Sequence, residues 1–540
     1  MNNSPACPES QVQGRVLMGG AWYEKDERIE SLNPATGEVI GSVPLCNQQD
    51  VESAVFAARQ ASGPWAALSA RKRFGYLDVV RSLLIQEGDV LASLITQENG
   101  KPLQESHFAD VGDSVDFLTG LLKGGEAYLA DRRVKATNPA LWARRLTVRR
   151  VPLGVVGVIS PWNFPLAIPM GQIVAALAAG NTVVFKPSEL TPLVGVKIAT
   201  LFHRAGLPPG VFNMVTGGKE TGAFLVECPL DGLLFTGSTG AGRSIQARLG
   251  PRLIPAEMEL GGKDAFLVLP DAPYERTVKG AVWSGLFGSG QACSSSERYF
   301  VPRSWMPRFA EDVAARVEGL KVGPGMDETV QVGPLISEDQ LARVEEQVQD
   351  AVSKGARLLC GGRRRPGPGF FFEPAVLTDV PLDCTLMREE TFGPVIPMVA
   401  YDDLDEAVRW CNDTAFGLSA SVWTAGLSAG EALARRLHVG SVWVNDSSST
   451  HGQAQCPWGG VKASGMGRTH WLGSLHELTT PQLVGLEKGT GHGELWWYPY
   501  GVDGIELFHR ARLFAGEGLG GKILHALPLL RALMNVKGSR

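Results

Sequence analysis

Apolar runs and helix-compatible segments alternate along the middle of the chain. Val155–Ile159 and Thr182–Phe185 are short, β-branched and uncharged, which is typical of strands covered on both faces. The alanine-rich segment 167–179 between them favours a helix. The pattern continues with a predicted helix over Leu193–Arg204 and predicted strands over Val211–Val215 and Gly232–Thr236. This alternation predicts a doubly wound α/β domain, in which ligands bind beyond the carboxyl ends of the strands.

One long segment of this region carries no charge. Residues 151–185 contain no Asp, Glu, Lys or Arg, and that length could cross a bilayer. Several prolines and glycines, together with Asn163 and Asn181, interrupt the segment. We therefore interpret it as a strand, loop, helix and strand within a buried parallel sheet.

The alternation restarts after Gly262. Ala265–Leu269 predicts a strand and Thr277–Phe287 a helix, and further candidates continue through residues 440–445. This pattern predicts a second α/β domain with its own sheet. Residues 361–369 are rich in Gly, Pro and Arg, which predicts a mobile, turn-rich loop. We interpret its arginines as solvated rather than as an anion site.

Composition narrows the class of protein. A chain of 540 residues is expected to hold more than one domain. Its 44% hydrophobic and 20% charged residues are ordinary for a soluble globular enzyme. The net charge of −5 and the pI near 6.1 argue against nucleic acid as a partner, because phosphate binding needs a basic face.

The cysteines and the N-terminus bear on metal binding and on the compartment. Eight cysteines are scattered along the chain, at positions 7, 46, 228, 293, 360, 384, 411 and 456. None forms a Cys-x-x-Cys pair or a Cys/His cluster with zinc spacing, so we expect no metal site and reduced thiols. The first five residues lack the basic and apolar regions of a signal peptide. A cytoplasmic location is the expectation.

Three short motifs offer the parts of an acyl-transfer site. The small-residue turn Gly290–Cys293 ends on a cysteine that could be a nucleophile, and Glu259 stands before a Gly-Gly bend where it could be a base. Asn163, within Pro161–Pro165, offers an amide. Alone, each has an ordinary alternative, since most cysteines are buried hydrophobes and most glutamates are surface charges. Only the three motifs together indicate an acyl-transfer site.

These motifs belong to an ordered set over residues 15–485. The set comprises Pro161–Pro165, Phe185–Glu189, Phe235–Ser238, Glu259–Lys263, Gly290–Cys293, Glu389–Pro394 and Pro457–Lys462. On these motifs the chain resembles the aldehyde dehydrogenase superfamily. The resemblance implies an α/β fold with a Rossmann-like cofactor domain, an α/β catalytic domain and a small bridging β-element for oligomerisation.

The resemblance implies the roles of the catalytic residues. Cys293 matches the nucleophile that forms a thiohemiacetal and then a thioester. Asn163 matches the oxyanion donor, acting with the Cys293 backbone N–H. Glu259 matches the general base that activates water to hydrolyse the thioester. Glu257 is the rival base, and the register to Leu260 and the two glycines favours Glu259.

The cofactor residues are implied in the same way. The turn Gly237–Gly242 is not the G-x-G-x-x-G fingerprint, but the resemblance places the pyrophosphate at such a helix start, where free N–H groups favour anions. Lys186 and Glu189 match positions that hold the adenosine ribose, and a carboxylate there favours NAD while leaving NADP possible. Glu390 matches the nicotinamide-ribose position; Phe392 lies beside it or belongs to the core. The other implied cofactor residues are Ile159, Ser160, Pro161, Trp162, Ser188, Phe235, Gly237, Ser238, Glu259, Leu260 and Gly261.

Departures from the family pattern bear on the substrate. Gly171 is expected to leave the substrate tunnel wide, and Gln172 cannot relay protons as a lysine could. The loop Asp446–Gly452 is polar and slightly longer than in the common form, and no arginine is clearly placed for a substrate carboxylate. We therefore expect a medium-chain, long-chain or bulky aldehyde. The alternatives are a succinate-semialdehyde-type substrate, a CoA-acylating or esterase activity, and an inactive scaffold that binds partners through its tail.

The domain limits and the tail complete the prediction. We expect a cofactor domain at 1–131 and 153–261, a catalytic domain at 262–464, an oligomerisation element at 132–152 and 477–489, and a C-terminal extension at 490–540. The extension holds six Lys/Arg and three acids beyond residue 500, with an apolar stripe at Ile523, Leu527, Leu530 and Leu533 that Pro528 interrupts. It is expected to pack on its own or a neighbouring subunit of a homodimer or homotetramer, with a membrane surface or gating of the tunnel mouth as alternatives.

Overall fold

The computed structural model describes residues 12–137, 144–448, 452–487, 496–498, 500–516 and 518–538. Cys7, residues 449–451 of the predicted polar loop, and Leu495 and Pro499 of the tail lie outside the described residues. The chain divides into two compact units, the first made of Met1–Asp131 with Arg149–Gln482 and the second of Arg132–Val148 with Leu483–Arg540. The predicted limits between cofactor and catalytic domains stay a prediction.

The first sheet has the strand order of a doubly wound domain. In space it runs β10 (Phe212–Met214), β9 (Thr182–Lys186), β8 (Val155–Ile159), β11 (Gly232–Thr236), β12 (Ala256–Glu259) and β20 (Gly465–Met466). The first five strands are parallel, and β20 pairs antiparallel with β12. The chain moves outward from β8 to β10 and then returns to β11. The strand order therefore reverses between β8 and β11, where such sheets bind ligands.

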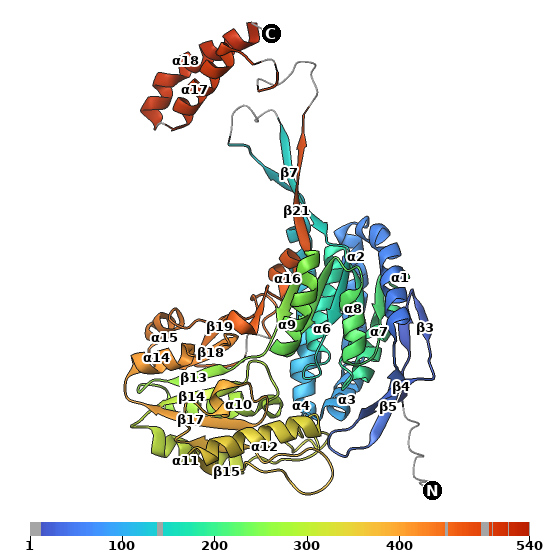
Figure 1. Ribbon diagram of the computed structural model, residues 1–540, viewed down its shortest axis with the longest axis vertical. Coiled ribbons are helices and arrows are strands. Elements are labelled where there is room, and N and C mark those ends of the chain that lie inside the picture. The colour runs from blue at the N-terminus through green and yellow to red at the C-terminus, as the bar shows by residue number, and fades with distance from the viewer. Residues whose placement is uncertain are drawn as a thin grey trace. The chain divides into compact units, whose positions relative to one another are not determined.

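Helices cover both faces of this sheet, as Figure 1 shows. One face carries α1 (Gln48–Ala66), α8 (Lys219–Glu227) and α9 (Thr239–Leu249). The other carries α2 (Ala70–Gln86), α3 (Gly88–Asn99), α5 (Asp113–Leu129), α6 (Ala167–Ala179), α7 (Pro192–Arg204) and α16 (Trp471–Glu477). All the strands from β8 to β11 are buried along their full length, which accounts for the uncharged run in the sequence. The predicted strand, loop, helix and strand over residues 151–185 are confirmed.

The second sheet is also mostly parallel. Its order is β15 (Arg357–Cys360), β16 (Ala375–Thr378), β17 (Val395–Tyr401), β14 (Ser296–Pro302), β13 (Asp264–Val268), β18 (Ser419–Trp423) and β19 (Ser441–Val444). Alternate residues of β13 enter different cores, since Ala265 and Leu267 join one apolar cluster and Phe266 and Val268 another. The sheet is therefore covered on both faces.

Six helices accompany this sheet. They are α10 (Tyr274–Leu286), α11 (Met306–Glu318), α12 (Glu338–Ser353), α13 (Thr385–Arg388), α14 (Leu404–Asn412) and α15 (Leu427–Ala434). The α/β prediction with a Rossmann-like cofactor fold is confirmed. The predicted loop at residues 361–369 is present and its arginines are exposed; Arg363 pairs at the surface with Glu373, and Arg364 with Glu338 and Glu345.

Short elements complete the first unit. They are β1 (Val12–Gln13), β2 (Val16–Met18), β3 (Ala21–Tyr23), β4 (Arg28–Leu32), β5 (Val39–Pro44), α4 (Leu103–Glu105), the π-helix η1 (Ser106–Gly112) and the 3₁₀ turns η3 (Gly250–Arg252), η4 (Phe287–Gly290) and η5 (Lys462–Ser464). Of these, α4 and η1 lead into α5, and η4 leads to Cys293. Both therefore bear on the site described below.

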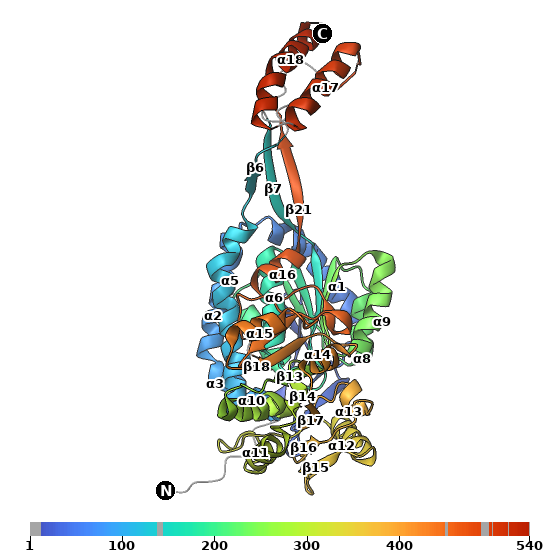
Figure 2. The ribbon, with the colours of Figure 1, turned by 90° about the vertical axis from the view of Figure 1, so that its left-hand side faces the viewer.

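The second unit contains a helical hairpin. A three-stranded sheet runs β21 (Thr479–Leu486), β7 (Arg145–Pro152) and β6 (Arg132–Val134) in space, and β6 pairs antiparallel with β7. Beyond it α17 (Val502–Gly516) and α18 (Leu519–Gly538) lie side by side (Figure 2). Contrary to the expected interruption, α18 runs through Pro528. Within the described residues, no helix combines the length and apolar character needed to cross a bilayer.

Candidate active site

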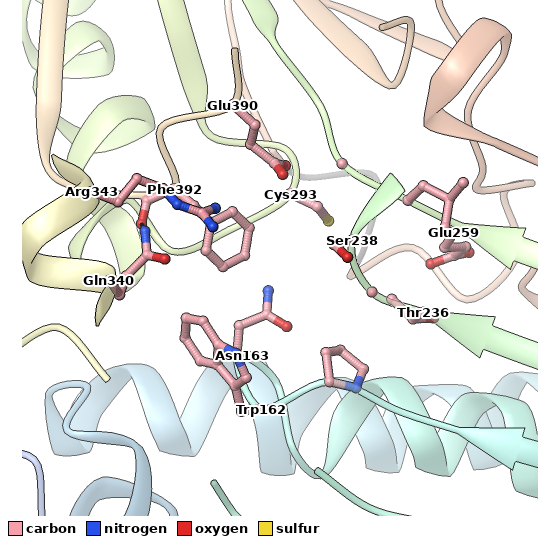
Figure 3. Close-up of a pocket in the computed structure, with 14 residues that line it drawn as sticks. Trp162, Asn163, Thr236, Ser238, Glu259, Cys293, Gln340, Arg343, Glu390 and Phe392 are labelled. Atoms are coloured by element: carbon pink, nitrogen blue, oxygen red, sulfur yellow. Dashed lines mark hydrogen bonds between the residues drawn. The ribbon is translucent and has the colours of Figure 1, made fainter. Parts of the chain in front are cut away.

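A pocket of about 250 Å³ lies at the carboxyl ends of β8, β11 and β12. It is the place that the reversal of strand order predicts. The predicted residues that line it are Pro161, Trp162, Asn163, Gly237, Ser238, Glu259, Leu260, Gly261, Cys293, Glu390 and Phe392. Figure 3 shows the Cys293 sulfur and the Asn163 amide pointing into the pocket from opposite sides. The other predicted residues, Ile159, Ser160, Lys186, Ser188, Glu189 and Phe235, do not line this pocket.

A tight turn presents Cys293 to the pocket. Gly288, Ser289 and Gly290 all have φ near +60° to +71°, so the chain reverses abruptly after α10. A Cβ atom on Gly290 would stand 2.1 Å from the Gly393 carbonyl oxygen, so only glycine fits there. The turn leaves Cys293 partly exposed, whereas most cysteines of the described chain are buried.

The surroundings of Cys293 favour its neutral form. Burial raises the pKa of the thiol well above 9.0, and the carboxylates of Glu259, Asp264 and Glu390 raise it further. A nucleophilic thiolate must therefore be generated with the help of a base or of further positive charge.

A buried ion pair holds the segment that carries Asn163. The Lys101 ammonium donates to the Asn163 carbonyl oxygen at 2.6 Å and pairs with Asp110 at 2.7 Å. The other Asp110 oxygen accepts from the backbone N–H groups of Leu166 and Ala167 at the start of α6. In turn, the Asn163 amide nitrogen donates to the Gln291 carbonyl oxygen at 3.0 Å, beside Cys293. That nitrogen carries two hydrogens, so a second remains for a ligand.

Two donors orient the Glu259 carboxylate. Its Oε2 accepts from the Trp458 indole N–H at 3.1 Å, and its Oε1 accepts from the Thr469 hydroxyl at 2.5 Å. Glu259 is buried at the end of β12, directly before the Leu260–Gly262 bend. Trp458 belongs to a motif found in the sequence, although no role was assigned to it there. The two hydrogen bonds stabilise a carboxylate that is fixed in place.

The rival carboxylate, Glu257, lies in a different environment. It is buried, and neither of its oxygens has a hydrogen-bond partner within the described part of the chain. Burial raises its pKa well above 4.5, and the charges of Glu259 and Glu477 raise it further. The raised pKa favours the neutral form of Glu257, and a neutral carboxyl group does not act as a general base. The structure therefore favours Glu259 as the base, as the sequence register does.

A polar network holds the loop that carries Glu390 and Phe392. Glu297 accepts from the backbone N–H groups of Thr391 and Phe392 and pairs with Lys263 at 2.5 Å. The Glu390 carboxylate accepts from the Gly262 N–H at 2.8 Å, and burial raises its pKa to about 7. A Cβ on Gly261 would stand 2.5 Å from that carboxylate, which explains the glycine.

Phe392 is held at the pocket edge rather than in a core. It has φ +54°, which is uncommon for an aromatic residue, and its carbonyl oxygen accepts from Gln340 at 2.8 Å. Its ring meets the Trp162 ring edge-to-face at 5.4 Å. Both rings line the pocket, so the alternative that Phe392 is only a core residue does not hold.

The helix α9 begins at the pocket. Its cap, Ser238, accepts from the Ala241 N–H at 3.3 Å, and the first two amides of the helix have no intrahelical acceptor. Gly237 is required there because a Cβ would stand 2.7 Å from the Phe235 ring. The Phe235 ring therefore lies against the turn at Gly237. This helix start offers N–H groups and a positive dipole end to an anion.

Lys186 and Glu189 form a pair beyond the pocket. The Lys186 ammonium donates to the Pro187 carbonyl oxygen at 2.9 Å and contacts Glu189 at 3.4 Å. Lys186 is buried, and the loss of solvent lowers its pKa. Glu189 is about half exposed, with its carboxylate accessible to solvent. Lys186 is the last residue of β9, which pairs with β8, and Glu189 follows the strand.

A second, small pocket adjoins Glu259. It is lined by Phe117, Ala167, Ile168, Gly171, Gln172, Glu259, Thr469 and His470. A Cβ on Gly171 would stand 3.4 Å from the Phe117 ring, so Phe117 borders the space that Gly171 leaves. The inference that Gly171 makes a wide tunnel is therefore corrected, because Phe117 on α5 narrows it. Gln172 donates to the Thr236 hydroxyl at 3.0 Å.

Several residues of the site are absent from the sequence prediction. Gln340 and Arg343 line the pocket from α12, and Lys101 supports Asn163 from the segment between α3 and α4. Ser337 is the N-cap of α12, and a serine at such a position is typical of a helix start. It does not indicate which residues of the helix face the pocket. These residues reach the site only through tertiary packing.

Comparison with known proteins agrees with this geometry. The model of the aldehyde dehydrogenase family matches residues 22–484. An aldehyde dehydrogenase from Brucella melitensis biovar abortus 2308 is 36% identical with a TM-score of 0.83, covering 88% of this chain and 98% of its own. An NADP-dependent enzyme from E. coli is 35% identical with a TM-score of 0.84, covering 88% and 98%. An aldehyde dehydrogenase from Mycobacterium tuberculosis, complexed with NAD+, is 34% identical with a TM-score of 0.85, covering 89% and 100%.

Proposed function

Because the chain belongs to the aldehyde dehydrogenase family, we propose that it oxidises an aldehyde to the carboxylic acid at Cys293, with NAD favoured as the cofactor. One observation carries the proposal. Cys293, Asn163 and Glu259 come from three separate segments, and all three line one pocket at the switch point of a doubly wound sheet. The nucleophile, oxyanion donor and base of the resemblance thus share one site.

The residues around the pocket fit a nicotinamide dinucleotide. The start of α9 at Ser238 suits the pyrophosphate, and Gly261 leaves room for the Glu390 carboxylate to face a ribose. The accessible carboxylate of Glu189 suits a ribose 2′-hydroxyl and repels a 2′-phosphate, which favours NAD over NADP. One solved relative is an NAD+ complex and another is NADP-dependent, so use of NADP remains compatible with the fold. When bound, the nicotinamide accepts the hydride of the substrate.

The protein residues act in sequence on the substrate carbon. The Cys293 sulfur, deprotonated with the help of a base, forms a bond to the carbonyl carbon, and the second hydrogen of the Asn163 amide stabilises the resulting oxyanion. Loss of hydride from that carbon leaves a thioester on Cys293. Glu259 then takes a proton from water, the hydroxide adds to the thioester carbon, and the C–S bond breaks to release the acid and the sulfur.

The substrate is proposed to be a medium-chain, long-chain or bulky aldehyde. Phe117, Phe164, Ala167, Ile168 and Phe287 belong to one apolar cluster next to Asn163, which suits a hydrocarbon chain. Phe117 narrows the space near Gly171, so the chain must fit between aromatic rings. A succinate-semialdehyde-type substrate would need a cation for its carboxylate, and the described lining of the second pocket holds His470 but no Lys or Arg.

Stopped-flow NADH formation tests the division of roles. With octanal, Glu259→Gln should release about one NADH per active site and then turn over 10²–10⁴ times more slowly, because the proton assigned to Glu259 is that of the hydrolytic water, which reacts after the acyl group has formed. Asn163→Ala should slow the first turnover by roughly 10²–10³, the usual effect of removing one oxyanion donor. A Glu259→Gln variant without a burst, or with normal turnover, would contradict the assignment. Turnover that depends on added CoA would show that the thioester has another acceptor.

A further inference from the structure

Helix α18 presents an apolar face to solvent. Leu519, Ile523, Leu527, Leu530 and Met534, which we term the outer stripe, are between 57% and 82% exposed. Their spacings of three and four residues place them on one side of the helix. A helix at the surface of a globular protein normally shows its charged side to water and its apolar side to the core. The outer stripe departs from this arrangement, because its apolar side chains face solvent.

The partner helix does not cover this stripe. In the hairpin, α17 packs on the opposite side of α18, where Leu507 and Ala532 are buried and Leu529 and Leu533 pack against them. Leu533, which the sequence grouped with the stripe, therefore belongs to the hairpin core. The outer stripe remains as surplus apolar surface, and such surfaces mark interaction sites.

Basic residues border the outer stripe. At about 100° per residue, Lys522 and Arg531 fall near its two edges, and both are exposed. The sequence of α18 holds three Lys/Arg and no Asp or Glu. Long basic side chains beside an apolar stripe can lay their stems along the apolar surface while their charged ends reach outward. This arrangement suits a partner surface whose interior is apolar and whose outer layer is negatively charged.

Exposed apolar, aromatic and basic residues also occur on α17 and just before it. Ile505 and Phe508 on α17 are exposed, and Arg512 lies one turn from Phe508. Tyr498 and Tyr500, just before the hairpin, are exposed aromatic residues. Amphipathic aromatic rings favour the boundary between lipid headgroups and acyl chains. These features suit a helical hairpin that lies on the surface of a bilayer.

We propose that the α17–α18 hairpin docks on an anionic phospholipid surface, with the outer stripe of α18 in the headgroup–acyl boundary. A second copy of α18 could also cover an apolar stripe. However, two such helices would bring Lys522 and Arg531 near like charges, and α18 offers no acidic residue to pair with them. Anionic headgroups supply the missing complement.

Vesicle flotation of the full-length chain tests this docking. The probes are phosphatidylcholine vesicles and vesicles with about 30 mol% phosphatidylglycerol, which carry the negative surface charge. The variant Ile523→Gln/Leu527→Gln/Leu530→Gln removes most of the stripe, and its side chains are exposed, so the fold is not expected to depend on them. A matched control, Ile85→Gln/Leu253→Gln/Leu427→Gln, changes one Ile and two Leu that are exposed in the first unit.

The wild type and the matched control should float with anionic vesicles, and the stripe variant should lose at least about tenfold in vesicle affinity. Lys522→Gln/Arg531→Gln should weaken binding to anionic vesicles by about tenfold and flatten its dependence on salt, because each basic residue contributes through charge. Circular dichroism should show the same helix content throughout.

Three results would overturn the proposal. The first is a wild type that floats with neither kind of vesicle. The second is a stripe variant that floats as the wild type does. Sedimentation could also show that the stripe variant dissociates an oligomer while the wild type binds no vesicles, which would assign the stripe to a second copy. None of these readouts depends on catalysis, so a failure here leaves the proposed function untouched.

Discussion

At the residue scale, Cys293 combines partial exposure with surroundings that oppose its charge. Burial and the carboxylates of Glu259, Asp264 and Glu390 all raise its pKa. In the absence of cofactor and substrate the thiol should therefore be unreactive at neutral pH, even though the turn before it presents it to the pocket.

Alkylation with iodoacetamide measures this directly. Cys293 of the apoenzyme should react slowly at pH 7 and faster as the pH rises, since the thiolate is the reactive form. Glu390→Gln removes one negative neighbour and should move the profile to lower pH. Peptide mass spectrometry supplies an internal control in Cys456, which is exposed. If Cys293 reacted faster than Cys456 at pH 7, the electrostatic account of the thiol would be wrong.

Glu257 gives a second test, on stability. Its folded-state pKa lies well above 4.5, the ordinary value, so the neutral form suits the fold. Its contribution to stability is full below the ordinary pKa and is lost as the pH rises through the folded-state value. Glu257→Gln should therefore gain stability relative to the wild type as the pH rises from about 4.5 toward the raised folded-state pKa. Thermal unfolding across that range measures the difference. A constant difference at all pH values would show that Glu257 does not titrate as described.

At the element scale, the segment between β8 and α6 depends on contacts that are distant in sequence. The Lys101–Asp110 pair is fully buried and joins the Asn163 carbonyl oxygen to the first amides of α6. Removal of one partner of a buried pair leaves an uncompensated charge, which costs about 3–5 kcal/mol. Removal of either partner should therefore destabilise the segment and displace Asn163.

Lys101→Met should lower both thermal stability and the rate of the first turnover, because Asp110 loses its counter-charge and Asn163 its anchor. Lys72→Met, at an exposed lysine on α2, is the matched control and should change neither. Stopped-flow NADH formation and differential scanning calorimetry report the two effects. A Lys101→Met enzyme with normal stability and a normal first turnover would show that this pair neither stabilises the protein nor positions Asn163.

Sequence patterns predict the elements of this region well and their contacts poorly. The strands β8 and β9 and the helix α6 are predictable because apolar runs covered on both faces have a local signature. Asn163, Glu259 and Cys293 are found because their motifs are local. Lys101 and Gln340 have no such signature, since each acts through a partner brought near by folding. The width expected from Gly171 fails for the same reason, because Phe117 lies on a different helix.

At the scale of the whole molecule, the expectation of a homodimer or homotetramer stays a prediction. Leu483 and Leu486 on β21 are more than half exposed in the second unit, at the element that the resemblance assigns to subunit contacts. Exposed apolar residues on a strand suit an interface between subunits. The expectation that the tail packs on its own or a neighbouring subunit also stays a prediction, and in the single described chain the outer stripe is exposed.

Leu483→Lys/Leu486→Lys should shift the sedimenting species to a smaller mass, because buried lysines at a subunit interface are costly. Leu253→Lys/Leu427→Lys places the same charges on exposed positions of the first unit and should leave the mass unchanged. Sedimentation velocity of both variants and the wild type gives the comparison. A wild-type monomer, or a Leu483/Leu486 variant of unchanged mass, would exclude this element as the interface.

The central claim is that Cys293 carries the acyl group during aldehyde oxidation. The most direct measurement is NADH formation over a series of aldehydes of increasing chain length, with succinate semialdehyde included, on the wild type, Cys293→Ala and the control Cys456→Ala. The account predicts activity that rises with chain length in the wild type and in Cys456→Ala, and none in Cys293→Ala. A preference for the semialdehyde would retain Cys293 and overturn the substrate proposal, whereas activity surviving in Cys293→Ala would contradict the account itself.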